Sequence, residues 1–263
     1  MSEGSNDGVR VDPHVKVLDA DVVERAKARG LDALVYAPHF TRLPDVRERA
    51  RRFSDDELLV VPGRELFTGT WRTRKHVLAV GLTDPVPDFL TLAGAMAELR
   101  RQDAAVLVPH PEFLTVSLDV ADVRQYRDVI DGIEVYNPKH RGRHNRRARE
   151  VAAATGLHPF GSSYAHLPRT VGEVWTTFDA AIDDESDLVE ALSDGAPRSV
   201  HHRDGASHAL ARHVEFAHLA WENTWKKFDR VYLQGTEPTH PDHIAYGGRF
   251  EDVRARGASG HLR

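Results

Sequence analysis

Short apolar runs alternate with amphipathic segments along residues 9–200 of the chain. The runs ALVYA, LLVV, HVLAVGL and AAVLV have the length of buried strands. The segment ADVVERAKARG instead places Val22, Val23 and Ala26 along one helical face, and Gly30 is a typical C-terminal stop. Because this alternation repeats, we expect βα units, a parallel sheet and an α/β fold.

Each expected helix leads into an expected strand, except that 76–82 reads as a strand of its own. Helices are expected at 20–30, 45–57, 89–103, 120–129, 145–156 and 184–195, and strands at 31–40, 58–67, 76–82, 104–113, 130–138 and 158–166. In folds of parallel βα units, functional side chains gather at the carboxyl ends of the strands. The polar residues that fall there are His39, Glu65, His110, Asn137 and His166.

The pattern changes near residue 200. A long aromatic segment of helical period, 207–234, precedes a Gly/Pro-rich stretch, 236–250. The spacing of Trp221, Trp225 and Phe228 favours packing against the preceding domain, or against a second copy of the chain in a homo-oligomer. We therefore divide the chain into a flexible N-terminus at 1–8, a domain at 9–200, and a C-terminal helical extension and tail at 201–263.

Composition narrows the chemistry. The 263 residues include no cysteine, which excludes disulfides, thiolate ligands and a cysteine nucleophile. The formal net charge of −5 disfavours nonspecific binding to duplex nucleic acid, whereas a phosphorylated small molecule or a short single strand remains compatible. The apolar runs are far shorter than the ~20 residues that a membrane helix needs. The polar start MSEGSNDGVR lacks the features of an export signal, so we expect a cytoplasmic protein without a membrane partner.

Six residues at the edges of apolar runs carry the most specific signal in the sequence. Neutral imidazole and carboxylate groups bind borderline divalent cations, and sets with an open position make hydrolytic centres. A single histidine at a strand end is more often structural than a ligand, but six such positions together predict a metal site built from several strand ends. These candidate ligands are His14, His39, Glu65, His76, His110 and His166.

The six segments resemble the PHP (polymerase and histidinol phosphatase) superfamily of metal-dependent phosphoesterases, over about residues 9–200. VDPHVK is similar to the family's D-x-H-x-H opening, ALVYAPHFT to its T-D-H segment, VVPGREL to its G-x-E, and KHVLAVGL, VLVPHPE and GSSYAH to its later histidine segments. The resemblance implies a distorted (β/α)7 TIM-like barrel of PHP type with up to three metal ions, in which Glu65 is the bridging carboxylate. IDGIEVYN also resembles a family segment, which places Glu134 and Asn137 near the site but not as ligands.

Three departures from the family pattern lower the expected number of ions. Lys16 stands in place of the second opening histidine, Pro38 in place of an aspartate, and Tyr164 in place of the aspartate in the last D-x-H. Lys16 and Tyr164 fall in the same family metal site, which would be empty or weak.

The retained ligands still suffice for a hydrolytic centre. Glu65, His76 and His110 make a three-ligand set, the arrangement of hydrolytic zinc centres. His39 and His166 leave an incomplete neighbouring site. We expect a divalent metal, Mn or Zn, with one or two ions rather than three.

The resemblance and the ligand set predict a phosphoesterase. A metal-activated water would hydrolyse the phosphate ester of a small nucleotide or of a short oligonucleotide end. His39 and His166 would bind a second ion or act as general acid and phosphate donor. The ammonium of Lys16 would either occupy the vacated metal position and support catalysis there, or belong to a solvated lysine on a drifted loop.

The basic stretch NPKHRGRHNRRAR follows a strand end and offers phosphate contacts. Arginine forks suit phosphoryl oxygens, so Arg141 and Arg143 are the expected substrate-binding residues, together with Asn137. The loop TWRTRKH is a weaker candidate. His140 and His144 lie among cations, so we expect surface positions for both.

A second hypothesis belongs to another class of protein. A PHP-like barrel weakened in catalysis would serve as a binding or scaffold subunit, and the lost ligand positions favour this reading. The retained histidines and Glu65 favour the enzyme.

Overall fold

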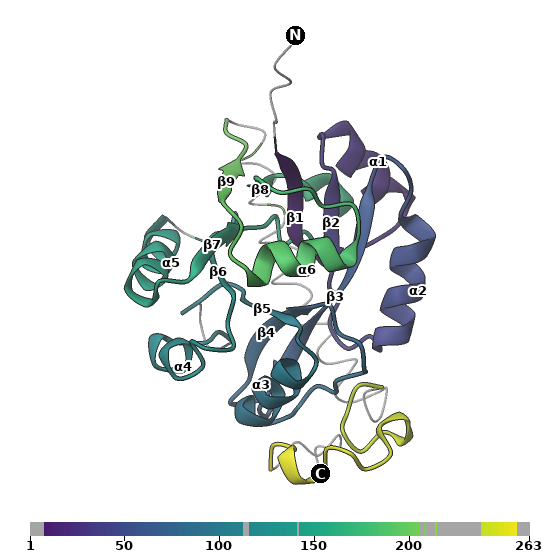
Figure 1. Ribbon diagram of the computed structural model, residues 1–263, viewed down its shortest axis with the longest axis vertical. Coiled ribbons are helices and arrows are strands. Elements are labelled where there is room, and N and C mark those ends of the chain that lie inside the picture. The colour runs from purple at the N-terminus through teal and green to yellow at the C-terminus, as the bar shows by residue number, and fades with distance from the viewer. Residues whose placement is uncertain are drawn as a thin grey trace.

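The computed structural model describes residues 8–112, 116–140, 142–205, 208, 214 and 238–256. Within these ranges, nine strands form one sheet in the order β7-β6-β5-β4-β3-β2-β1-β8-β9, with helices packed around it (Figure 1). The strands are β1 (Val9–Val15), β2 (Ala33–Tyr36), β3 (Leu59–Thr68), β4 (Lys75–Val80), β5 (Ala105–Val108), β6 (Gly132–Tyr136), β7 (His158–Gly161), β8 (Val174–Phe178) and β9 (Arg198–His202). The helices are α1 (Ala20–Ala28), α2 (Leu43–Phe53), α3 (Leu92–Arg101), α4 (Val120–Gln125), α5 (Gly142–Thr155) and α6 (Glu185–Ser193), with 3-10 turns η1 (Pro168–Thr170), η3 (Ile244–Tyr246) and η4 (Glu251–Val253).

The sheet is mixed, which corrects the expectation of a parallel sheet. β1, β2 and β3 are parallel, as are β5, β6 and β7, but β4 runs antiparallel to both of its neighbours. The cause is the short turn between β3 and β4, because parallel strands need a crossover that so few residues cannot make. β8 and β9 are also antiparallel to the strands beside them, and the apolar pattern did not indicate either one.

The sheet curves into a nearly closed barrel, so the predicted barrel fold is confirmed. β7 lies beside β8 and β9 at the seam. There the Thr176 hydroxyl accepts a hydrogen bond from the Gly161 N–H (2.9 Å) and donates one to the Gly161 carbonyl (3.0 Å). The buried carboxylate of Asp12 accepts from the backbone N–H groups of Ser163 and Gly172, both at 3.0 Å. Side chains thus complete the closure where strand pairing ends.

Replacing Thr176 by valine is expected to destabilise the protein by about 2 kcal/mol, because both backbone groups of Gly161 then lose a buried partner. Valine keeps the shape of threonine, so packing stays nearly unchanged. Urea unfolding measures the change, with Thr177→Val as the matched control on the neighbouring, partly exposed residue. Equal stabilities for the two variants would show that the seam does not depend on this hydroxyl.

The barrel interior is filled by small and branched side chains from alternate strand positions. Val35, Val61, Leu107 and Phe160 belong to this buried cluster, and α6 adds Leu188, Ala191 and Leu192. In Figure 1 α6 crosses in front of the strands. Its residue Val189 lies against Gly81, at the end of β4 that is opposite His76. Helix α6 therefore plugs the amino ends of the parallel strands and leaves their carboxyl ends for the site.

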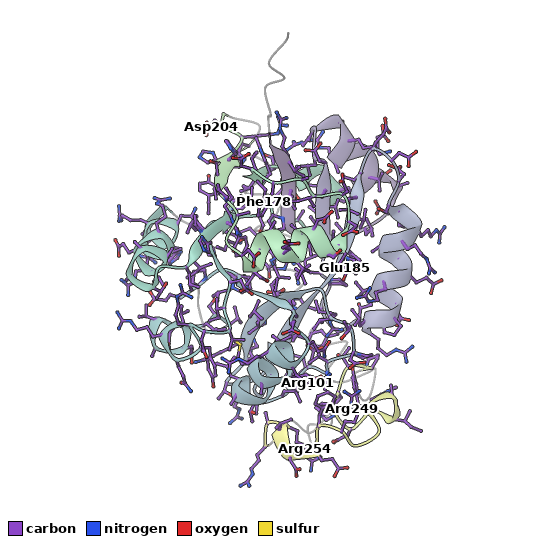
Figure 2. The ribbon with its side chains drawn as sticks, viewed as in Figure 1. Arg101, Phe178, Glu185, Asp204, Arg249 and Arg254 are labelled. Carbon is purple, nitrogen blue, oxygen red and sulfur yellow. The ribbon has the colours of Figure 1, made fainter. Side chains whose placement is uncertain are left out.

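Residues 238–256 pack against the barrel near α3, although the sequence suggested a loose tail. The backbone N–H of Asp88 donates to the Thr239 carbonyl (2.8 Å), and that of Thr91 donates to the Val253 carbonyl (2.8 Å). Arg249 lies close to Arg101 of α3 in Figure 2, and both approach the carboxylate of Glu98.

The expected helix at 207–234 lies almost entirely outside the described residues, as do Trp221, Trp225 and Phe228, so the division at residue 201 stays a prediction. Among the described residues, every helix is too short or too polar to span a membrane.

Candidate metal centre

Strand alternation points Glu65 and His76 into the barrel. On β3 the positions Val61, Gly63 and Glu65 face inward, while Arg64 faces outward and pairs with Asp88 (3.0 Å). His76 is the second residue of β4, and Glu65 lies near the end of β3. Because β4 is reversed, its first residue lies at the same barrel end as the last residues of the parallel strands.

The fully buried carboxylate of Glu65 is the hub of the site. Its Oε1 lies 3.1 Å from His76 Nδ1 and 3.0 Å from His110 Nε2. Its Oε2 lies 2.9 Å from His39 Nε2 and 3.4 Å from His14 Nε2. Four histidines from four different strands or strand ends therefore converge on one carboxylate.

The residues present fit a divalent cation. Ligand atoms of His39, Glu65 and His76 all lie within 4.8 Å of one another. Within the described part of the chain, the buried ring nitrogens His14 Nδ1, His39 Nδ1 and His76 Nε2 have no hydrogen-bond partner. Buried polar atoms without partners are costly, and a cation is the partner that neutral imidazoles and a carboxylate share.

The protonation states of the site favour metal binding. Burial lowers the pKa of His14 and of His39 to about 3, so both rings are neutral near pH 7. Burial opposes ionisation of Glu65, but Lys16 and the surrounding histidines outweigh it and hold the pKa of this carboxyl well below its usual value. Neutral imidazole and ionised carboxylate are the forms that bind a metal ion.

Glu134 supports His110 from behind. Its carboxylate accepts hydrogen bonds from the His110 backbone N–H (2.7 Å), the Asn137 amide (3.0 Å) and the Ser162 hydroxyl (2.5 Å). The Asn137 amide oxygen accepts from the backbone N–H of Lys139 (3.0 Å). Glu134 and Asn137 thus lie near the centre, and both side chains are hydrogen-bonded to protein groups.

Lys16 is buried in the site rather than solvated. Its ammonium contacts Glu65 Oε2 and donates to the Ala37 carbonyl (2.7 Å). Burial lowers the pKa of Lys16 to about 8, although Glu65 acts in the opposite direction. The reading of Lys16 as a solvated residue on a drifted loop is therefore wrong.

A second buried lysine, Lys139, engages the last histidine of the set. Its ammonium contacts the Tyr164 carbonyl, lies 2.6 Å from His166 Nδ1, and lies 4.1 Å from the centre of the Tyr164 ring. Tyr164 has a strained backbone, with φ of 47°, and its ring packs against those of His14 and His110. The Lys139 ammonium and the Tyr164 carbonyl thus both lie within hydrogen-bond distance of His166 Nδ1, at 2.6 and 3.0 Å. Sequence reasoning missed Lys139, which lies in a run of basic residues that reads as surface.

The two arginines expected to contact phosphate are not among the residues that contact Glu65 in the described part of the chain. Arg143 is exposed on the first turn of α5, and Arg141 lies outside the described residues. His140 is buried and its ring lies 6.5 Å from that of His110, which corrects its expected surface position. His144 is partly buried and packs against His140. The backbone N–H of His140 donates to the Asn137 carbonyl (3.1 Å), in the turn that follows β6.

Comparisons with known proteins agree with this architecture. A family model described as PHP-associated matches residues 142–197. PsfC from Pseudomonas syringae superposes with a TM-score of 0.62 at 19% identity, over 81% of this chain and 99% of PsfC. The lesion-specific endonuclease EndoQ from Pyrococcus furiosus gives 0.53 at 15% identity over 73% of this chain, which spans 57% of EndoQ. An amidohydrolase from Chromobacterium violaceum, solved with bound sulfate and no metal, gives 0.50 at 14% identity, over 75% of this chain and 99% of its own. No curated protein matches the sequence significantly.

The fold and the histidine–glutamate cluster define a mixed α/β barrel with a candidate metal centre at one end. The PHP-associated match over residues 142–197 supports the resemblance to the PHP superfamily that the histidine segments indicate, and the solved structures share the barrel fold of this chain. At these identities the solved structures speak for the fold, and the activity of this chain rests on its own residues.

Proposed function

We propose that this protein is a metal-dependent phosphoesterase. The observation that carries the proposal is the convergence of His14, His39, His76 and His110 on the buried carboxylate of Glu65. Such a set, with neutral imidazoles and an ionised carboxylate, has the chemistry of a hydrolytic metal site.

Glu65, His39, His76 and His110 would hold the ion. A divalent cation bound there would supply hydroxide near neutral pH by lowering the pKa of water, and would polarise a phosphoryl oxygen. Glu65 neutralises part of the ion's charge and fixes the rings of His76 and His110. Glu134 holds the backbone of His110 in place, and the Ser117 hydroxyl lies 3.0 Å from His110 Nδ1.

Two lysine ammonium groups supply positive charge at positions where additional metal ions would otherwise supply it. The ammonium of Lys16 contacts Glu65 Oε2, and the ammonium of Lys139 contacts His166 Nδ1. Both side chains are buried, where electrostatic interactions are stronger than in water. We infer that the centre binds one ion, and that Lys16 helps to hold the substrate phosphate. With the Lys139 ammonium beside its ring, His166 would donate a hydrogen bond to a phosphoryl or leaving oxygen rather than bind a second ion.

The proposed substrate is the phosphate ester of a small nucleotide or of a short oligonucleotide end. The net charge of −5 opposes tight binding to long duplexes, which depends on neutralising many phosphates. Lys16 and Lys139 provide positive charge inside the barrel mouth, where a single terminal phosphate would reach it. Arg141 and Arg143 would contact the substrate.

The test is the metal content of untagged protein purified without chelator, measured by mass spectrometry. We expect about one equivalent of Mn or Zn per chain, lost on treatment with a chelator together with phosphoester hydrolysis, and restored by adding back the ion. A chain that takes up no ion from Mn or Zn solutions would refute the enzyme and favour a binding or scaffold barrel. Two or more equivalents would contradict the replacement of ions by lysines.

A further inference from the structure

An aromatic wall adjoins the metal centre on one side. It consists of Phe40, Phe67, Trp71 and Phe89, whose ring centres lie 4.9–6.0 Å apart. Phe40 follows the ligand His39 in the chain, and the two ring centres are 5.8 Å apart. The ring of Phe67 lies 5.5 Å from that of His76. The wall therefore begins one ring away from two of the groups that would hold the ion.

The exposure of the site shows where a substrate enters. The side chain of His39 is 23% exposed, whereas His14, Lys16, Glu65, His76 and His110 have side chains that are 9% exposed or less. Solvent reaches the centre mainly at His39. Phe40 and Trp71 are the partly exposed members of the wall, so an entering molecule meets these two rings.

Two residues of the aromatic wall have strained backbones. Phe40 and Phe89 both have left-handed backbones, with φ of 50° and 61°, a region that residues with large side chains rarely adopt. Such strain clusters at binding and catalytic sites and persists where the surroundings enforce it. At Phe89 two backbone hydrogen bonds hold this conformation. Its N–H donates to the Phe67 carbonyl (2.5 Å), and its carbonyl accepts from the Ala255 N–H (2.8 Å).

The turn that carries Trp71 is also fixed. Gly69 has φ of 78°, and a Cβ there would lie 2.7 Å from the Thr73 carbonyl oxygen. The Arg74 guanidinium donates to the Trp71 carbonyl (2.5 Å), which holds the half-buried arginine beside the wall. Packing of Phe67 and Phe89 against Ala255 accounts for the buried half of the wall. This packing does not account for the strained backbone of Phe40, which follows the proposed ligand His39.

We propose that the aromatic wall binds the planar ring of the substrate, and that Phe40 and Trp71 stack on the base of a nucleotide whose phosphate lies at the metal centre. This rests on the phosphoesterase proposed above and deepens it. The rings offer stacking faces and few hydrogen-bonding groups, so recognition is by shape and tolerates different bases. The shared chemistry is a planar aromatic ring joined to a phosphate, and an aryl phosphate would use the same faces.

The experiment compares adenosine 5′-monophosphate, ribose 5-phosphate and adenosine on the metal-loaded protein. We expect kcat/KM for the nucleotide to exceed that for ribose 5-phosphate by about tenfold or more, as one stacked base provides. In Phe40→Leu and Trp71→Leu this ratio should fall toward one, and the affinity for adenosine, measured by calorimetry, should fall about tenfold. Cytidine 5′-monophosphate should follow the adenine nucleotide, and 4-nitrophenyl phosphate reports whether an aryl ring without sugar is also accepted.

Two further variants separate stacking from damage to the fold. Phe40→Trp keeps a stacking face and should keep the ratio, and thermal melting checks that each variant is folded. Phe53→Leu changes a partly buried phenylalanine on α2, away from the wall, and should leave the ratio and the adenosine affinity unchanged.

The outcomes distinguish the two proposals. Equal kcat/KM for nucleotide and sugar phosphate, with folded variants that leave this ratio unaltered, would overturn the base-binding wall and leave the phosphoesterase standing. Adenosine binding that both wall variants weaken, without hydrolysis of any ester, would support the wall and refute the phosphoesterase. Absence of binding by both adenosine and the nucleotide would overturn the wall.

Discussion

Replacing Glu65 by glutamine is expected to weaken metal binding by more than about 100-fold, because changes to groups that only support a ligand already cost 10- to 100-fold. The amide keeps the shape of the side chain but loses the negative charge that the carboxylate places beside His39 and His76. Hydrolysis of phosphate esters should fall to background. Titration of Mn or Zn into chelator-treated protein measures the first effect, and steady-state kinetics measure the second.

Two controls keep the Glu65 result interpretable. Glu57→Gln changes a carboxylate that is 77% exposed and paired with Lys27, and should alter neither metal affinity nor activity. Glu65→Gln also leaves Lys16 without its counter-charge, which costs about 3–5 kcal/mol of stability when such a pair is buried. The double variant Glu65→Gln with Lys16→Met removes both charges, and it should fold better than the single variant while still failing to bind the ion. Wild-type metal affinity in a folded Glu65 variant would place the ion elsewhere.

Replacing Lys16 by methionine is expected to change metal binding in the opposite direction. The ammonium neutralises Glu65 Oε2, so its removal exposes more negative charge to the cation and should strengthen metal binding. Activity should nevertheless fall about 10- to 100-fold, the range that a charge-assisted hydrogen bond to phosphate of about 1.5–3 kcal/mol provides. The loss should appear in kcat/KM for every phosphate ester, with or without a base.

Lys27→Met is the matched control, because Lys27 pairs with Asp55 and Glu57 on the surface. It should leave both metal affinity and kcat/KM unaltered. Full activity in Lys16→Met, accompanied by lower stability alone, would limit Lys16 to a structural role.

Strand ends were the part of the site that the sequence could predict. His39, Glu65 and His110 lie where apolar runs stop, and local patterning alone places them at one barrel end. His76 shows the limit of this reasoning, since it stands at the start of its run and reaches the site only because β4 is reversed. That reversal follows from the short turn at 69–74, which contains a glycine but no helix.

Local patterning could not reveal that two lysines of the site, Lys16 and Lys139, are buried. Lys139 sits in a basic run and Lys16 in a polar-looking strand end, and both are enclosed by residues distant in sequence. The strands β8 and β9 were not predicted for a related reason, because the sequences VWTTF and RSVHH mix polar and apolar residues and carry no long apolar run. Their strand character depends on pairing with β1 and with each other, which is a tertiary property.

The closure of the barrel also bears on the order in which the protein folds. The seam at Gly161 and Thr176 and the plug of α6 both come from residues 158–202, whereas His14, His39, Glu65, His76 and His110 all precede them. During synthesis the chain would therefore carry nearly all the proposed metal ligands before it can bury the apolar interior beneath them. Contacts between β1 and β8 join residues far apart in sequence, a topology that slows folding. An early-bound ion would tie the first half of the chain together and shorten the search for that last closure.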